Sequence, residues 1–380
     1  MTYDIATGLY DVKRLAELLD VKPSTIRSMK ARGTLPSPTC NDINGGAVWL
    51  KETIDIYIAD KKYNLELTEP INKNLPQVID LFSGCGGMSL GFRKAGFDIL
   101  AGFDNWDKAL ETYNANFEHP AYLLDLGDIE KSIETLKPYF MERNKPIIIG
   151  GPPCQDFSSA GKRQEGARAD LTENYATIVS KLQPSFFVME NVARAEKAAA
   201  YGRALEIFKG NGYFVDHIVL NAAKAGVPQR RKRLFTFGAK DKELISELIK
   251  KLEENLSSKE MTVRDWFGDR LDVEYYYRHP RSYARRAIFS VDEPSPTIRG
   301  VNRPIPEGYE GHPGDAGPIE KARPLTTRER ASLQTFPDEF GFTSSKTNNE
   351  QMIGNAVPVE LARYVASQIK ETLKSHQFEF

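Results

Sequence analysis

The sequence has few cysteines, no excess of charge and no long apolar run. Cys40, Cys85 and Cys154 are too few and too widely spaced for a disulfide framework or a zinc site. Lys plus Arg total 51 and Asp plus Glu total 52, so the net charge of −1 does not indicate a polyanionic partner. No window approaches the roughly 18 apolar residues of a membrane span, and the N-terminal segment does not resemble a signal peptide. We therefore expect a cytoplasmic protein in a reducing compartment, with no metal and no membrane partner.

The composition is typical of a globular chain. Of the 380 residues, 41% are apolar and 27% are charged. This balance excludes disorder and collagen, and the length allows one large domain with a smaller companion.

The first sixty residues carry a helix-turn-helix pattern. Apolar residues recur at helical spacing from Val12, a turn follows near Asp20, and a second helix starts at about Pro23. A wing strand over 45–49 and a helix over 53–58 come next. The second helix presents a polar and basic face of the kind that enters the major groove, with Thr25, Arg27 and Lys30 as candidate DNA contacts. A helical hairpin that only packs on the main domain is the alternative.

Strand-like and helix-like segments alternate after a polar linker. The expected strands are 78–82, 99–103, 146–149, 186–189, 214–220 and 234–237. Such alternation predicts an α/β fold with a doubly wound, mostly parallel sheet. The expected divisions are 1–65 for the helix-turn-helix module, 66–76 for the linker, 77–238 for the α/β domain, 239–320 for an irregular module and 321–380 for a return to the α/β domain.

The first strand of this domain ends in a glycine turn that precedes a helix. Glycines at Gly84 and Gly86 let ligand polar groups approach backbone N–H groups, although a purely structural turn is an equal alternative. Asp104 ends the second strand, where a carboxylate can bind two ribose hydroxyls; a helix N-cap is its alternative role.

A loop of two glycines and two prolines carries Cys154 after the 146–149 strand. This position is the carboxyl end of the sheet, where open α/β sheets bind ligands. A thiolate is the strongest side-chain nucleophile near neutral pH, and the prolines would hold it in place. Cys85 and Cys40 are interpreted as structural.

Charged residues at two further strand boundaries face the same crevice. Glu190 ends the 186–189 strand and could donate a proton if desolvated; a solvated acid is the alternative. Alternation places Arg231 and Arg233 on one face with Gln229, where paired guanidiniums suit phosphate or carbonyl oxygens. A solvated basic run is the alternative there.

The order of these segments resembles a known family. DLFSGCGGMSLGF, GGPPCQDFS, MENV, QRRKR, RPLTTRERASLQTFPD and QMIGNAVP are similar to the successive motifs of bacterial-type DNA (cytosine-5) methyltransferases. The resemblance covers roughly Val78 to Lys374, apart from the variable stretch before Lys321. It implies a fold of the S-adenosylmethionine-dependent methyltransferase type, with 77–238 as the catalytic and cofactor-binding domain and 239–320 as the target recognition domain.

The resemblance also implies catalytic roles. Cys154 would add to carbon 6 of a flipped cytosine while Glu190 binds and protonates ring nitrogen 3. Carbon 5 would then take the methyl group from S-adenosylmethionine, without a metal or redox cofactor. Arg231 and Arg233 would lie near the base, with Arg231 expected at the cytosine carbonyl. Residues 162–170 resemble the mobile loop that closes over the DNA.

The cofactor and DNA contacts follow from the same motifs. Phe82 resembles the aromatic residue beside the adenine, and Asp104 the ribose-binding acid; the family often has tryptophan next, where this chain has Asn105. Asp128 with Ile129 resembles the pair that reads the adenine amino group, but Asp125 competes for that role. Pro152, Gly354, Asn355 and Val357 are further cofactor candidates. The expected DNA contacts are Gln155, Ser158, Lys162, Arg168, Gln229, Thr297 and Arg299, with Arg278, Arg281, Arg285, Arg286 and Arg303 as weaker candidates.

These expectations make the chain a sequence-specific methyltransferase of double-stranded DNA in a restriction-modification system, acting as a monomer. One alternative is a tRNA cytosine-5 methyltransferase of the same fold. Another gives the main role to the helix-turn-helix as a transcriptional regulator that binds its own promoter DNA.

Overall fold

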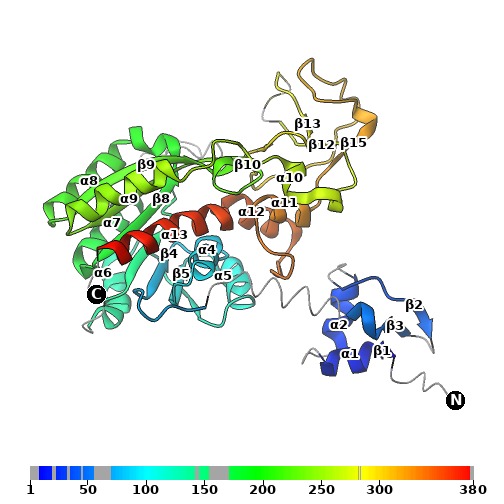
Figure 1. Ribbon diagram of the computed structural model, residues 1–380, viewed down its shortest axis with the longest axis horizontal. Coiled ribbons are helices and arrows are strands. Elements are labelled where there is room, and N and C mark those ends of the chain that lie inside the picture. Colours follow the sequence, from blue (N-terminus) through cyan, green and yellow to red (C-terminus); the bar gives the residue numbers. More distant parts are fainter. Residues whose placement is uncertain are drawn as a thin grey trace. The chain divides into compact units, whose positions relative to one another are not determined.

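The computed structural model describes residues 8–18, 23–31, 35–43, 46–54, 70–141, 145–153, 171–280, 282 and 284–376. Contacts divide the chain into two compact units, residues 1–68 and a larger unit of 69–336 with 340–380 (Figure 1).

The N-terminal unit combines two helices with a small antiparallel sheet. Its elements are β1 (Leu9–Asp11), α1 (Val12–Leu18), α2 (Pro23–Ala31), β2 (Cys40–Ile43) and β3 (Gly46–Leu50), with the strands in the order β1-β3-β2. Leu15, Ile26 and Trp49 are fully buried between the helices and the sheet. The predicted helices and wing strand are therefore present, and residues 51–54 are helical as well. DNA binding by this unit stays a prediction.

The larger unit contains a seven-stranded sheet in the order β6-β5-β4-β7-β8-β11-β9. The strands are β4 (Val78–Leu81), β5 (Ile99–Asp104), β6 (Ala121–Leu123), β7 (Ile147–Gly150), β8 (Phe186–Val192), β9 (Phe214–Asn221) and β11 (Lys232–Ala239). All neighbouring pairs are parallel except those of β11, which runs antiparallel to β8 and β9. The predicted mostly parallel sheet is confirmed.

Helices cover both faces of this sheet (Figure 1). One apolar core joins it to α4 (Gly87–Lys94), α9 (Lys242–Glu254) and α13 (Val359–Ser375), and another joins it to α6 (Ile129–Leu136), α7 (Leu171–Leu182) and α8 (Ala199–Gly210). Successive residues of β7 alternate between the cores, with Ile147 and Ile149 in the first and Ile148 in the second. Burial on both faces explains why the central strands are continuous apolar runs.

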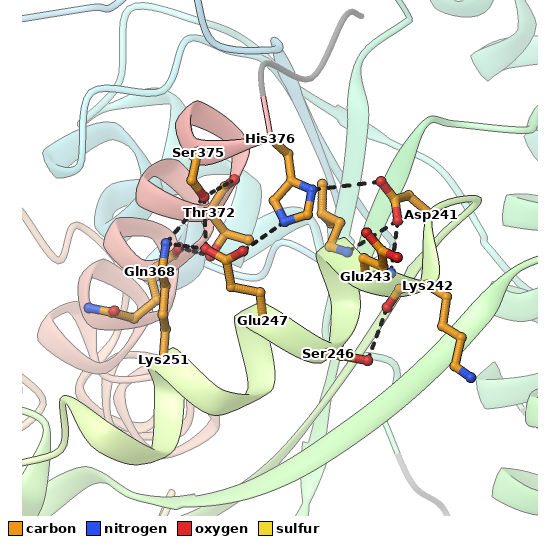
Figure 2. Close-up of polar contacts among 11 residues, drawn as sticks. Asp241, Lys242, Glu243, Ser246, Glu247, Lys251, Gln368, Thr372, Ser375 and His376 are labelled. Atoms are coloured by element: carbon orange, nitrogen blue, oxygen red, sulfur yellow. Dashed lines mark hydrogen bonds and ion pairs between the residues drawn. The ribbon is translucent and has the colours of Figure 1, made fainter.

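The boundaries predicted around the irregular module differ from the structure. Helix α9, expected inside 239–320, packs on the sheet core with α13 because Leu244 and Leu248 complete that core. Figure 2 shows polar contacts between α9 and the end of α13: Ser375 Oγ donates to Glu247 Oε1 at 2.8 Å, and the Glu247 carboxylate lies 2.8 Å from His376 Nε2. Hydrogen bonds from Lys251 and Ser375 lower the pKa of Glu247 to about 2, so the Glu247 carboxylate stays ionised over the neutral range.

The rest of the 239–320 stretch contains short elements that continue into the C-terminal segment. They are α10 (Val263–Phe267), β12 (Tyr275–Tyr277), β13 (Ile288–Ser290) and β14 (Ser295–Pro296), followed by β15 (Ala322–Pro324), α11 (Thr327–Leu333) and α12 (Lys346–Asn355). The strands form a β13-β12-β15 sheet, while β14 pairs with β10 (Gln229–Arg230). Since β15 lies beyond residue 320, the small sheet combines strands of the 239–320 stretch with a strand of the C-terminal segment.

The end of the predicted linker is part of the larger unit. Asn72 N–H donates to the Gly96 carbonyl at 2.9 Å, and Leu75 is buried in the sheet core. Residues 70–76 are therefore attached to the domain rather than acting as a spacer.

Gly91 permits the close contact between α4 and α13. A Cβ there would overlap Ala362 and the backbone of Val359 and Arg363. We expect Gly91→Ala to lower the free energy of unfolding by about 1–3 kcal/mol, because a helix backbone must shift. Denaturant unfolding measures this. Gly202→Ala in α8, where a Cβ meets open space, is the control and should stabilise by roughly 0.5–1 kcal/mol; equal effects of the two changes would contradict the packing argument.

Candidate active site

A cavity of about 520 Å³ lies at the carboxyl ends of β4, β5, β7 and β8. Strand order reverses here, because β4 lies between β5 and β7, and open α/β sheets bind ligands at such a switch point. The cavity lining includes these predicted residues: Phe82, Gly84, Asp104, Asn105, Pro152, Glu190, Arg231, Arg233, Gly354, Asn355 and Val357.

The glycine turn forms one wall of this cavity. Phe82, Gly84 and Gly86 have φ angles of 60°, 54° and 93°, a left-handed backbone that costs a non-glycine residue such as Phe82 about 1–3 kcal/mol. Gly86 is the N-cap of α4 and packs against Phe117, so it supports the turn from outside the cavity lining. The Ser83 hydroxyl lines the cavity, is buried and has no partner among the described residues.

Asp104 is anchored to that turn. Its two carboxylate oxygens accept hydrogen bonds from Gly84 N–H at 2.8 Å and Trp106 N–H at 2.9 Å. Burial raises the pKa of Asp104, while these backbone donors oppose the increase. The N-cap of α5 (Asp107–Asn114) is Trp106, so the alternative role of Asp104 as the cap does not apply.

Trp106 is a cavity residue that the sequence analysis missed. The family pattern led us to look for tryptophan immediately after the ribose-binding acid, where this chain has Asn105. Both Asn105 and Trp106 line the cavity. The tryptophan lies one position further along the sequence, and the extended backbone before α5 directs its indole to the cavity.

The two aspartates predicted as alternatives for binding the adenine amino group lie in different places. Asp125 lines the cavity, whereas the Asp128 carboxylate caps α6 by accepting from Lys131 N–H at 3.1 Å. Ile129 packs against the second core. The structure thus brings Asp125 to the cavity and places Asp128 and Ile129 outside its lining.

Glu190 and Arg233 form an ion pair in the opposite wall. Arg233 Nε lies 2.8 Å from Glu190 Oε1, and the two side chains are 13% and 11% exposed. Burial raises the pKa of Glu190, and the positive charges of Arg233 and Arg231 oppose this shift. The predicted desolvation of Glu190 is therefore present, while the alternative of a solvated acid does not fit.

The segment that precedes Cys154 in the sequence is attached to the same wall. Asn191 Nδ2 donates to the Pro152 carbonyl at 3.1 Å, and Pro153 lines the cavity. Gly151 lies against Glu190, because a Cβ there would be 3.1 Å from its Oε2. Residues 151–153, which directly precede Cys154 in the sequence, therefore belong to the cavity wall. Cys154, Gln155, Ser158, Lys162 and Arg168 themselves lie outside the described residues.

Arg231 has a different environment from the one predicted for it. It is 1% exposed, and its Nη atoms donate at 3.0 Å to the carbonyls of Ile298, Gly354 and Ala356. Its guanidinium thus binds main chain, and Arg233 is the cation paired with Glu190. The expectation that Arg231 binds the cytosine carbonyl is not supported by these partners.

Gln229 is also turned inward, contrary to its predicted DNA contact. It is completely buried; its Nε2 donates to Gln334 Oε1 at 2.7 Å and its Oε1 accepts from Ile298 N–H at 2.8 Å. Pairing of β10 with β14 places this amide between two chain segments, away from solvent.

Several of the remaining candidates lie between residues 278 and 303 of the larger unit. Thr297 is half-buried and its hydroxyl donates to the Arg230 carbonyl at 2.9 Å, while half-buried Arg299 donates to the His279 carbonyl. Arg286 forms a bidentate pair with Glu293. Arg281 lies outside the described residues.

Cys85 has the properties of a structural thiol. It is 2% exposed, and burial raises its pKa to about 12, so it stays protonated. Cys40 is half-buried in β2, in the other unit. Within the described ranges, no His, Cys, Asp or Glu group is arranged to hold a metal ion. In that same part of the chain, no helix has the length and apolar character needed to cross a bilayer.

This fold and site are those of a cofactor-dependent transferase, and comparisons with known proteins identify its family. Residues 76–371 match the family model for C-5 cytosine-specific DNA methylase. The chain is 52% identical over 304 residues to Type II methyltransferase M.HgiDI of Herpetosiphon aurantiacus, covering 80% of this chain and 97% of that protein. It is also 52% identical over 304 residues to Type II methyltransferase M.HindV of Haemophilus influenzae, covering 78% and 98%.

Solved structures agree with this assignment at the level of the fold. The S. pombe Dnmt2 methyltransferase matches with a TM-score of 0.56 and 17% identity over 80% of this chain and 100% of that one. The chain belongs to the C-5 cytosine-specific DNA methylase family. It is a DNA cytosine-5 methyltransferase, and S-adenosylmethionine is its methyl donor.

The cavity residues fit this cofactor. Asp104 offers carboxylate oxygens for ribose hydroxyls, Trp106 and Phe82 offer aromatic surface, and the unpartnered Ser83 hydroxyl offers a polar contact. Asp125 adds an acceptor for an amino group.

Trp106→Ala should weaken S-adenosylmethionine binding about tenfold, because the cavity loses most of one apolar wall. Isothermal titration calorimetry measures the dissociation constant, and Trp106→Phe is the matched control that should retain most of the affinity. Unchanged affinity in Trp106→Ala would show that the indole does not contact the cofactor.

Proposed function

We propose that this chain is the modification enzyme of a restriction-modification system and methylates cytosine at one double-stranded DNA sequence, working as a monomer in the cytoplasm. The relatives that it matches over 97% and 98% of their length are named Type II methyltransferases. The observation that carries the catalytic part is the Glu190–Arg233 pair, which shares one cavity with the cofactor residues Phe82 and Asp104.

Each catalytic residue has one task in this proposal. The Cys154 thiolate adds to carbon 6 of the flipped cytosine, and Glu190 delivers a proton to ring nitrogen 3. Burial raises the pKa of Glu190, so the carboxyl carries this proton at a higher pH than an exposed acid would. Arg233 holds the carboxylate in place through its 2.8 Å contact. The cofactor supplies the methyl group for carbon 5, whose proton then leaves as Cys154 is expelled.

Arg231 acts in this scheme as a positioning residue. Its bonds to Ile298, Gly354 and Ala356 hold the end of the recognition region and the last cofactor motif beside β11. Its Nε has no partner among the described residues, so one donor is left in the cavity lining.

Cys154→Ala should reduce methyl transfer to DNA below detection, because Cys85, the thiol that lines the cavity among the described residues, stays protonated and cannot replace it. Bisulfite sequencing of DNA from cells that express the protein measures this and reads the target sequence. Cys40→Ala, in the N-terminal unit, is the control and should methylate normally. Full methylation by Cys154→Ala would refute the covalent mechanism.

A tRNA substrate is the alternative within the same chemistry. The Dnmt2 likeness is 17% identical and concerns the fold alone. The Type II methyltransferase relatives at 52% identity favour DNA. Incorporation of labelled methyl groups into bulk tRNA, measured beside plasmid DNA, separates the two.

We further propose that the N-terminal unit binds DNA, including the promoter of its own gene. Helix α2 buries Ile26 completely and leaves Arg27 exposed, with Thr25 and Lys30 half-buried beside it. The helix is thus held through Ile26, and its exposed residues Ser24, Arg27 and Ser28 are polar. A recognition helix has this arrangement.

Replacing Arg27 and Lys30 together with alanine should weaken binding to the promoter fragment roughly tenfold, because two cations near phosphates are lost. Gel-shift titration at fixed salt measures this, with Lys13→Ala on the exposed side of α1 as the control. Methylation of the target site should be unchanged in all three proteins. Equal promoter affinities would assign the unit a purely structural role.

A further inference from the structure

A chain of hydrogen bonds leads from the cavity into the protein. Asp80 lines the cavity and is 1% exposed. Ser89 Oγ donates to Asp80 Oδ2 at 2.6 Å, Tyr113 Oη donates to Ser89 Oγ at 2.8 Å, and Tyr113 Oη lies 2.9 Å from His119 Nε2. The four groups come from β4, α4, α5 and the loop after α5.

The two ends of this chain differ in exposure. Ser89 and Tyr113 are completely buried, whereas His119 is half-buried. Each hydroxyl can donate and accept, so all the bonds can reverse direction together when one proton enters or leaves. This series of hydrogen bonds therefore connects the cavity to the outer side of α5, and no side chain has to move.

The surroundings of Asp80 disfavour its negative charge. Facing it are Ser89 from α4, Asp104 from β5, Tyr113 from α5 and Tyr175 from α7, and none of these is a cation. Burial raises the pKa of Asp80 to about 7; Asp104 adds to the increase and Ser89 opposes it. A positive charge in the cavity would reverse this preference.

The His119 end is neutral under the same conditions. Burial lowers the pKa of His119 to about 4, with Asp98 opposing and Arg93 reinforcing the decrease. A neutral imidazole can take a proton at one ring nitrogen and release one from the other, and this makes it a suitable exit for the chain.

We propose that Asp80 holds a proton when no cation lies in the cavity and releases it through Ser89, Tyr113 and His119 when S-adenosylmethionine binds, so that the site distinguishes the cationic cofactor from its neutral thioether product. This rests on the cofactor assignment above. Asp80 is then a specificity residue for the cofactor rather than a participant in the chemistry at the base.

The proton balance is simple. Asp80 gives its proton to Ser89 Oγ, the Ser89 proton passes to Tyr113 Oη, and the Tyr113 proton passes to His119 Nε2. The proton on His119 Nδ1 goes to water, so one proton leaves Asp80 and one reaches the solvent. After methyl transfer the sulfur is neutral, Asp80 takes a proton back by the reverse path, and the product loses the attraction that held the cofactor.

Calorimetric titration in two buffers of different ionisation enthalpy counts these protons. At pH 7 we expect release of about half a proton on binding S-adenosylmethionine and none on binding S-adenosylhomocysteine. A carboxyl whose pKa falls on binding favours the complex at higher pH, so cofactor affinity should rise about tenfold from pH 6 to pH 8 while product affinity stays flat. Equal proton release for both ligands would overturn the proposal; no cofactor binding at all would instead refute the cofactor assignment.

Variants test the individual groups. Asp80→Asn should abolish proton release and flatten the pH dependence. Ser89→Ala should move the midpoint of that dependence to higher pH, because the carboxylate loses a donor. Ser180→Ala, at a buried serine of α7 without a described partner, is the control and should leave the midpoint unchanged. A pH dependence that persists in Asp80→Asn, or a midpoint that does not move in Ser89→Ala, would refute the role of Asp80.

Tyr113→Phe tests the route itself. It interrupts the chain but keeps the Ser89–Asp80 bond, so stopped-flow mixing with a pH indicator should show at least roughly tenfold slower proton release at similar equilibrium affinity. An unchanged release rate would refute the path through His119.

Discussion

The buried guanidinium of Arg231 joins three segments that are distant in the sequence. It lies between β10 and β11 and binds the carbonyls of Ile298, Gly354 and Ala356. Removing a cation from water costs several kcal/mol unless its donors are satisfied, and here the carbonyls and the nearby Glu190 offset that cost. The Gly354 and Ala356 segments that Arg231 binds line the cavity together with Arg231 itself, so this side chain stabilises that part of the cavity wall.

The charged residues of the cavity form two groups, one on the proposed cofactor side and one on the proposed base side. On the cofactor side, Asp80 and Asp104 lie within one desolvated region, and Asp104 raises the pKa of Asp80. On the base side, Arg233 compensates Glu190 at 2.8 Å. In the proposed function, the acids at one end attract the cationic cofactor, and the paired carboxyl of Glu190 at the other end serves proton transfer.

The sheet was largely predictable because its central strands are buried on both faces and therefore appear as short apolar runs. Strand β6 was missed, since of its three residues only Ala121 is buried. Helix α9 was recognised as amphipathic but assigned to the wrong module, because its apolar stripe does not specify which surface it covers. In the site, strand alternation predicted one common face for Gln229, Arg231 and Arg233. Arg231 and Arg233 line the cavity, whereas the pairing of β10 with β14 buries Gln229 outside its lining.

By itself, the sequence determined the chemistry: the order of its motifs identifies the family, and the residue types supply an acid, a cation pair and a glycine turn at strand ends. Only the tertiary structure decided which neighbours of similar chemistry serve the cavity. Asp125 rather than Asp128 lines it, Trp106 supplies the aromatic wall, and Arg233 rather than Arg231 pairs with Glu190. Spacing along a chain limits where a side chain can point, but its partners lie on other elements, and their packing selects among the remaining positions.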